Sequence, residues 1–167
     1  LDDVFLYFGL SAVFGALFWM LGEHLPREFF LLLAAVLCGF AALRYVDSVA
    51  AVASFLSAMG AVFSLAGRLA GPHAALVLPF VGMGCSGLVW WLVKRFERGG
   101  PARFYELPMA FMEAAALLVF YACGNFWCLQ TGAVEFFGMS EVPLPALFWA
   151  FTVFVPLAMI GLGLRRR

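Results

Sequence analysis

Charged residues are scarce in this chain. Lys, Arg, Asp and Glu make up only 12% of its 167 residues, whereas about a quarter is usual in soluble domains. Hydrophobic residues make up 65%, and the mean hydropathy is +1.01. A soluble chain of this length leaves a large share of its surface in water, so this composition excludes an ordinary soluble domain. We therefore expect lipid to be the solvent for most of the chain.

Residues that carry enzyme chemistry are also few. There are only two histidines, His24 and His73, and neither belongs to a catalytic arrangement with Ser or an acid. The four cysteines include no C-x-x-C pair, so a redox motif or an iron–sulfur ligand set is unsupported. Cys123 and Cys128 are about 140° apart around one predicted helix, so they cannot bridge while that helix is intact. We therefore expect no enzyme, no metal site and no cofactor, haem included. The alternative is a surface metal site of Glu23, His24, Glu28 and His73, whose spacing matches no zinc or di-iron pattern.

The few charges separate long apolar runs. Ten basic residues balance ten acidic ones, so no overall field attracts nucleic acid. Five runs are long enough, at 1.5 Å per residue, to cross a bilayer core of ~30 Å as helices. They are Val4–Gly22, Ser48–Gly67, Ala74–Val93, Met109–Leu129 and Ala146–Leu164. The sequence therefore predicts an all-α, polytopic membrane bundle.

A sixth run, Phe29–Leu43, is shorter and gives only ~22 Å of helix. It spans if Arg27 and Arg44 reach the two interfaces along their long side chains. We predict that it does, because it is apolar on every face and an interfacial helix needs a polar one. The prediction is a single transmembrane domain, 1–167, of six helices, or five if this one does not span. Their expected ranges are 4–22, 27–44, 48–67, 74–93, 108–129 and 145–164.

Local signals agree with helices, which satisfy their own backbone hydrogen bonds in lipid. Pro108 and Pro145 stand at helix starts, where a missing N–H costs nothing, and Asp47 can cap the third helix. Residues 130–145 are predicted to form an outer loop. The first run follows Asp2 and Asp3 rather than basic residues, which argues against a cleaved signal peptide. Because the chain begins with Leu, we allow for an excerpt from a longer protein.

The basic residues predict the orientation. With six spans, one side carries Arg44, the four basic residues of 94–103 and the C-terminal Arg165–Arg167, whereas the other carries only Arg27 and Arg68. The positive-inside rule therefore places both termini in the cytoplasm. With five spans the C-terminus stays cytoplasmic and only the N-terminus changes side. We expect a bacterial inner membrane, because the chain is compact and poor in loops.

Small residues predict where helices approach closely, which is the usual packing device in lipid. The third predicted helix is small on nearly every face, and we expect it to be central. Gly82 and Ser86 in the fourth helix, and Ser11 and Gly15 in the first, are four residues apart. Such faces serve packing within one bundle or, alternatively, association with another subunit.

Two prolines are candidate kinks inside predicted helices. Pro79 lies near the outer end of the fourth helix, and Pro156 lies in the middle of the sixth. A proline removes a backbone donor, so Pro156 leaves the Thr152 carbonyl without its usual partner. Kinks of this kind can supply carbonyls to a binding site, as discontinuous helices do in transporters.

Glu113 is the one charge inside the five long runs, and it is a candidate functional acid. It lies about one turn inside the predicted cytoplasmic edge. Arg103 or Lys94 can reach it there, so we favour a structural ion pair over a proton-carrying role. Asn125 lies ~18 Å further along the same predicted helix and about 120° around it, so the two residues cannot form one site.

Two functions fit these observations. We favour a membrane protein without a catalytic site that packs with itself or with another membrane protein. The alternative is a small proton- or cation-coupled transporter or channel that uses Glu113. An enzyme acting on lipid would need a nucleophile or a metal, and the residues supply neither.

Overall fold

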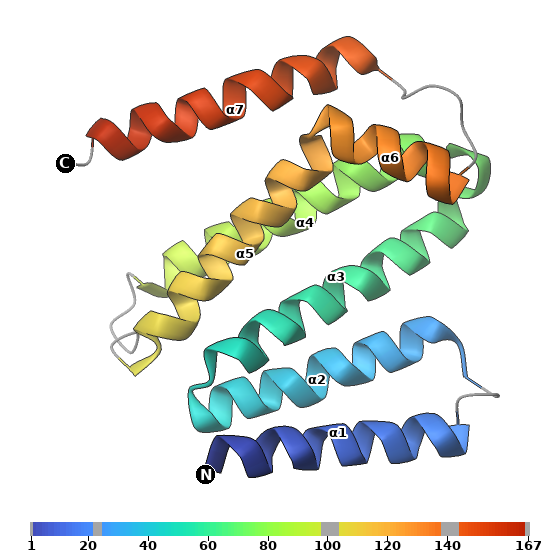
Figure 1. Ribbon diagram of the computed structural model, residues 1–167, viewed down its shortest axis with the longest axis vertical. Coiled ribbons are helices and arrows are strands. Elements are labelled where there is room, and N and C mark those ends of the chain that lie inside the picture. The colour runs from blue at the N-terminus through green and yellow to red at the C-terminus, as the bar shows by residue number, and fades with distance from the viewer. Residues whose placement is uncertain (1, 22–24, 98–103, 138–143, 166–167) are drawn as a thin grey trace. The chain divides into compact units, whose positions relative to one another are not determined.

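A computed structural model of the chain describes residues 2–21, 25–97, 104–137 and 144–165, and all regular structure in these ranges is helical. The fold is therefore all-α, as predicted. The helices of the described ranges, shown in Figure 1, are α1 (Asp2–Leu21), α2 (Arg27–Tyr45), α3 (Ser48–Ala70), the short 3-10 helix η1 (Gly71–His73), α4 (Ala74–Glu97), α5 (Glu106–Gly124), α6 (Phe126–Phe137) and α7 (Pro145–Arg165).

Four of these helices, α2 to α5, are long and apolar enough to cross a bilayer. They include α2, which the sequence marked as the shortest candidate. Shorter apolar stretches are described in α1 (Tyr7–Met20) and in α7 (Pro145–Ala158). These helices are compatible with an integral membrane protein.

The chain divides into two compact units. Unit 1 contains residues 1–65 and 89–115, and unit 2 contains residues 66–88 and 116–167. The boundary falls within α3, α4 and α5, so each of these helices contributes to both units.

The prediction of one helix over 108–129 is wrong in its C-terminal part. The structure ends α5 at Gly124 and begins α6 at Phe126, and α6 continues to Phe137 through residues predicted as outer loop. The break has a local cause, because Gly is the preferred residue after a helix and Asn is a preferred N-cap. This break was not predicted from the sequence because the residues around it are almost uniformly apolar.

The start of α5 also differs from the prediction. The helix begins at Glu106 and Pro108 lies within its first turn, where the backbone N–H has no partner in the helix in any case. Glu113 therefore lies about two turns from the start of the helix rather than one.

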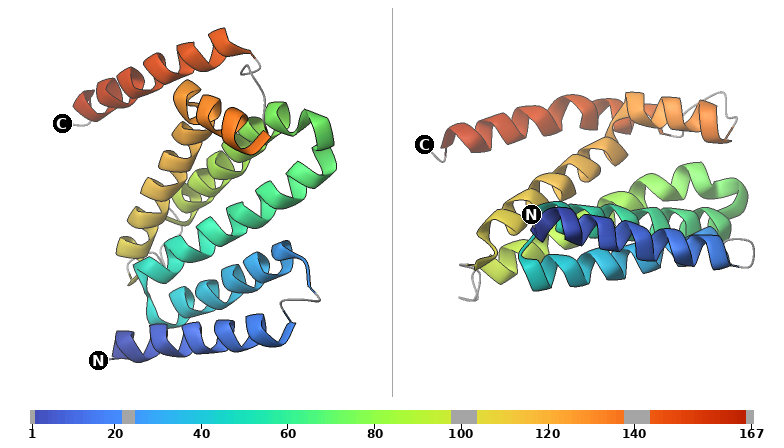
Figure 2. Two further views of the ribbon diagram at one scale, coloured as in Figure 1. Left: turned by 45° about the vertical axis from the view of Figure 1, so that its right-hand side comes forward. Right: turned by 60° about the horizontal axis from the view of Figure 1, so that its bottom comes forward.

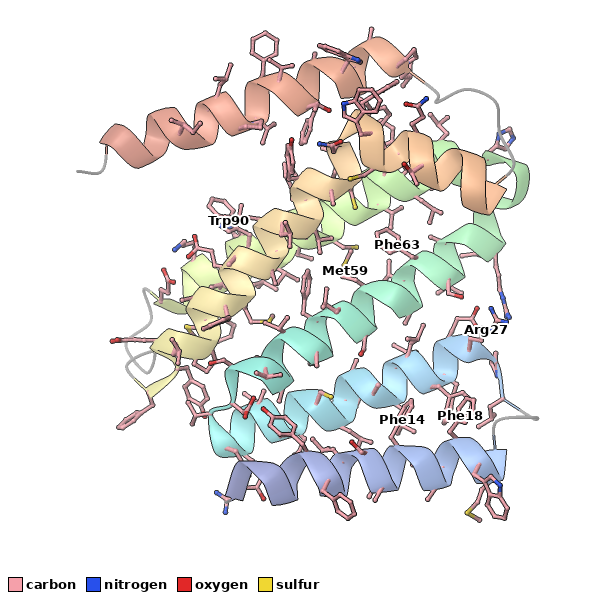
Figure 3. All side chains as sticks on the ribbon, viewed as in Figure 1. Phe14, Phe18, Arg27, Met59, Phe63 and Trp90 are labelled. Atoms are coloured by element: carbon pink, nitrogen blue, oxygen red, sulfur yellow. The ribbon has the colours of Figure 1, made fainter. Side chains whose placement is uncertain are left out.

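In unit 1, α1, α2 and α3 lie side by side, as Figures 1 and 2 both show. Phe14 and Phe18 of α1 point toward α2 (Figure 3) and meet Phe30 edge-to-face, with ring centroids 6.4 and 5.3 Å apart. Phe30 is buried. Aromatic pairs of this geometry add stability beyond the area that they bury.

Small residues bring α2 and α3 together. Ser54 Oγ donates a 2.7 Å hydrogen bond to the Ala35 carbonyl, and a Cβ at Gly39 would lie only 3.1 Å from Ser54 Oγ. The end of α2 packs on the start of α3 through four buried alanines: Ala41, Ala42, Ala50 and Ala51. Of the four candidate spans, α3 buries the largest share of its apolar window, 28% against 17% for each of the others. This agrees with the expected close packing of α3.

Asp47 fixes the turn between α2 and α3, where Val46 takes a left-handed conformation. One carboxylate oxygen of Asp47 accepts a 2.7 Å bond from the backbone N–H of Ala50 and so caps α3, and the other accepts a 2.6 Å bond from the Tyr7 hydroxyl. Desolvation acts to raise the pKa of Asp47, but the hydrogen bonds from Tyr7 and from the α3 backbone outweigh it and lower the pKa below 3.8.

Unit 2 is built around aromatic rings of α7. Phe148 is fully buried, with its ring centroid 5.9 Å from that of Phe80. Phe151 packs against Phe120 at 5.6 Å and covers Gly124 so closely that a Cβ there would overlap the ring. Glycine at 124 therefore lets the end of α5 approach α7.

Candidate functional site

The candidate acid, Glu113, lies in unit 1 and belongs to a group that we call the ion-pair site: Trp90, Lys94 and Glu113. Lys94 Nζ lies 2.6 Å from Glu113 Oε2, and Trp90 Nε1 donates a 3.2 Å hydrogen bond to Glu113 Oε1. Trp90 and Lys94 are one turn apart on α4, so both reach the same side of the helix. The structure thus brings Lys94 and Glu113 together.

The ion-pair site is partly shielded from solvent. The side chains of Lys94 and Glu113 retain 24% and 23% of their exposure. Lys94 also contacts Glu97, with 3.0 Å between Nζ and Oε2. Both carboxylate oxygens of Glu113 therefore have a donor, and Lys94 is shared between two acids. This arrangement can hold α4 to α5.

The remaining candidates are not part of the ion-pair site. Arg103, the alternative partner of Glu113, lies outside the described residues. Pro79 is buried in α4 and Pro156 is half-buried in α7, and both belong to unit 2. Neither proline ends its helix.

The break between α5 and α6 contains a buried polar side chain, Asn125, whose capping role was not predicted. Asn125 is buried, and its Oδ1 accepts hydrogen bonds from the backbone N–H of Trp127 (2.9 Å) and Cys128 (3.3 Å), so it caps α6. The remaining N–H of this turn, on Phe126, donates to Thr152 Oγ1 of α7 at 2.8 Å. The Gly-Asn pair was the available local signal. Nothing local pointed to Thr152.

Thr152 links this break to the Pro156 kink position. Its carbonyl, which Pro156 cannot bond, accepts from the Tyr121 hydroxyl at 3.5 Å. Its hydroxyl donates to the Phe148 carbonyl at 2.8 Å. The Tyr121 hydroxyl of α5 thus replaces the backbone donor that the Thr152 carbonyl lacks because of Pro156. Figure 2 shows α6 turning away from α5 beside α7.

A second carboxylate, Glu28, is buried in the first turn of α2. Its Oε1 accepts a 2.7 Å hydrogen bond from Ser64 Oγ of α3. The proposed surface metal site gains no support. Its members Glu23 and His24 lie outside the described residues, and within the described ranges no group of three or more His, Cys, Asp or Glu could hold a metal ion.

The cysteines are all free, and only Cys128 is exposed. We expected a continuous helix to keep Cys123 and Cys128 apart, but the helix breaks between them at Asn125. The premise was therefore wrong, although the two thiols remain unbridged.

All five tryptophans are exposed and lie toward helix ends. They are Trp19 in α1, Trp90 and Trp91 in α4, Trp127 in α6 and Trp149 in α7. A soluble protein buries most of each Trp. In a membrane protein, Trp is enriched at the two lipid–water interfaces.

Comparison of the chain with families of known proteins, with curated proteins and with solved structures finds no match.

Proposed function

We propose that the chain is a multi-pass inner-membrane protein with six transmembrane helices and both termini in the cytoplasm. At 20 and 21 residues, α1 and α7 are each about 30 Å long, enough to cross the core, whereas α6, at 12 residues, is about 18 Å long and too short. The exposed tryptophans and the unequal distribution of Lys and Arg support this embedding.

Contacts in unit 1 support the alternation of the spans. Tyr7 near the start of α1 bonds Asp47 in the α2–α3 turn, and Tyr105 before α5 bonds the Leu43 carbonyl at the end of α2. Helices that cross in alternating directions bring these three segments to one membrane face. Reporter fusions after Arg167 test the topology. We expect a reporter that works only in the cytoplasm to be active there. Activity of a reporter that works only outside the cytoplasm would contradict the proposed orientation.

Within the membrane we propose a role in assembly, either with a second copy or with a partner subunit. The observation that carries this is a small-residue face on α1. The small residues that join α2 to α3 are used within the chain, whereas no side chain occupies the space beside Gly15. The exposed face, which we call the α1 face, consists of Gly9, Ser11, Ala12, Gly15 and Ala16.

The ends of the α1 face are aromatic. Phe8 and Trp19 are both strongly exposed and lie within about 40° of Gly15 around the helix axis. The small residues between them leave room for the backbone of another helix to approach, as small residues do at helix contacts in lipid.

The ion-pair site argues against the alternative in which Glu113 carries protons. The acid inside the candidate span of α5 has donors on both oxygens, and one donor is a lysine of the adjacent span. A paired acid of this kind stabilises helix packing, whereas a proton carrier must exchange its proton during each cycle.

The test is Gly15→Leu in the full chain, purified in mild detergent and weighed by native mass spectrometry. Gly84→Leu on α4 is the matched control, because its site is also exposed with open space around it. We expect Gly15→Leu to release monomers and Gly84→Leu to keep the wild-type complex. A wild-type protein that is monomeric and retains no partner would overturn the proposal.

A second candidate, a small proton- or cation-coupled transporter, is favoured by the break between α5 and α6. Broken helices form substrate and ion sites in transporters, and here the break is tied to α7 through Thr152. Flux in proteoliposomes tests it. A Glu113→Gln protein that moves solute with unchanged rate and pH dependence would remove Glu113 from any transport mechanism.

A further inference from the structure

Two arginines of unit 1 lie over aromatic rings rather than beside acids. The Arg44 guanidinium lies 6.0 Å from the centre of the Tyr45 ring, and that of Arg95 lies 5.3 Å from the Trp91 ring. All four side chains are exposed, and each arginine is in the last turn of its helix, α2 or α4. Within the described part of the chain, no carboxylate lies within 4.0 Å of either guanidinium.

Both arginines belong to the same end of unit 1, and α5 connects them. Leu43, next to Arg44, accepts the hydrogen bond from Tyr105 at the start of α5. Lys94, next to Arg95, pairs with Glu113, which is eight residues or about 12 Å further along α5. The helix ends that carry Arg44 and Arg95 are therefore both bonded to the first half of α5.

Most carboxylates described at this end already have hydrogen-bond or ion-pair partners within the protein. Asp47 bonds Tyr7 and caps α3, while Glu97 and Glu113 share Lys94. Glu106 is the exposed exception, and it lies in the first turn of α5, where the helix dipole favours an acid. Lys94 is thus neutralised by its neighbours, whereas Arg44 and Arg95 retain their charge for an external anion.

We infer that Arg44 and Arg95 bind the phosphates of anionic phospholipids at the cytoplasmic face. The planar guanidinium presents two parallel donors to phosphate oxygens, and this fork is pre-organised where an aromatic ring supports it. Tyr and Trp place their rings at the depth of the headgroups. The inference rests on the membrane embedding proposed above and is independent of the assembly role.

The test is binding of phosphatidylglycerol, compared with phosphatidylcholine of the same acyl chains, to the purified full chain in detergent by native mass spectrometry. A cation near an anionic headgroup strengthens binding by about fivefold. We therefore expect Arg44→Gln and Arg95→Gln to weaken phosphatidylglycerol binding by about fivefold each and the double variant by about thirtyfold. Phosphatidylcholine binding should not change.

The matched control is Arg27→Gln. Arg27 is also exposed but lies at the opposite end of α2 (Figure 3), and no described aromatic ring lies beneath its guanidinium. It should bind phosphatidylglycerol as the wild type does. The double Arg→Lys variant keeps the charge without the fork and should bind with intermediate affinity, which provides a second measurement if the glutamine variants fold poorly.

Two results would overturn the inference: wild-type phosphatidylglycerol binding by the double glutamine variant, or an equal loss in Arg27→Gln. If the wild-type protein inserts into lipid vesicles but binds the two lipids equally in detergent, the inference is refuted and the membrane proposal stands. A wild-type protein that stays in the aqueous phase refutes both.

Discussion

Replacing Glu113 by Gln measures the contribution of the ion-pair site to stability. The substitution keeps the shape of the side chain and removes its charge, so the 2.6 Å contact with Lys94 loses its ionic character. A hydrogen bond between charged groups contributes about 1.5–3 kcal/mol. Because about a quarter of each side chain is exposed, solvent screening reduces the expected loss to about 1–2 kcal/mol.

Glu97→Gln is the matched control, since Glu97 shares the same lysine. That pair is longer, at 3.0 Å, more exposed, and three residues apart on one helix. Exposed pairs of this spacing contribute about 0.5 kcal/mol or less. We therefore expect Glu113→Gln to destabilise the protein clearly more than Glu97→Gln.

The assay is a double-mutant cycle of Glu113→Gln and Lys94→Gln, with the free energy of unfolding measured by denaturant titration in one detergent. A coupling energy of about 1 kcal/mol is expected between the two sites. Additive losses of unfolding free energy, or a loss in Glu113→Gln no larger than that in Glu97→Gln, would refute the structural role of the pair. Either result would favour a role for Glu113 in binding a proton or cation.

Three further predictions concern the turns and the α5–α7 contact. Gly124→Ala should destabilise unit 2 by about 1–3 kcal/mol, because its Cβ would overlap the Phe151 ring; Gly84→Ala, which has open space, should not lower the melting temperature. Asn125→Ala should cost about 1 kcal/mol and speed amide exchange at Trp127 and Cys128, whereas Asn125→Ser should retain the cap. Because the folded pKa of Asp47 lies below 3.8, its stabilisation is complete at neutral pH and is lost as the pH falls from about 4 through the folded pKa. Tyr7→Phe should reduce this loss in acid unfolding titrations, and an unchanged profile would contradict the assigned hydrogen bond.

The length of each apolar run was enough to predict most of the helices. Five of the six expected ranges agree with the structure within a few residues, α2 among them. The reason is physical, since a chain in lipid has few alternatives to a helix and charged or turn residues mark the ends. The fifth range failed at Gly124 and Asn125, where two punctuating residues stand inside an apolar stretch.

The polar contacts were less accessible to prediction. Lys94 and Glu113 lie at neighbouring ends of consecutive helices, so their proximity could be predicted from the order of the helices alone. Glu28 and Ser64 are 36 residues apart, and Phe126 and Thr152 are 26 apart. Which faces of these helices meet depends on packing between helices, and a nearly uniform apolar pattern has no periodicity from which to infer it.

The mass of the particle extracted in native lipid tests the assembly proposal most directly. The full chain would be released from its membrane in polymer-bounded lipid discs without detergent and weighed by native mass spectrometry. The account predicts more than one copy of the chain, or the chain with a second protein, and loss of that complex in Gly15→Leu but not in Gly84→Leu. A single chain in each disc, together with solute flux that Glu113→Gln abolishes, would contradict it.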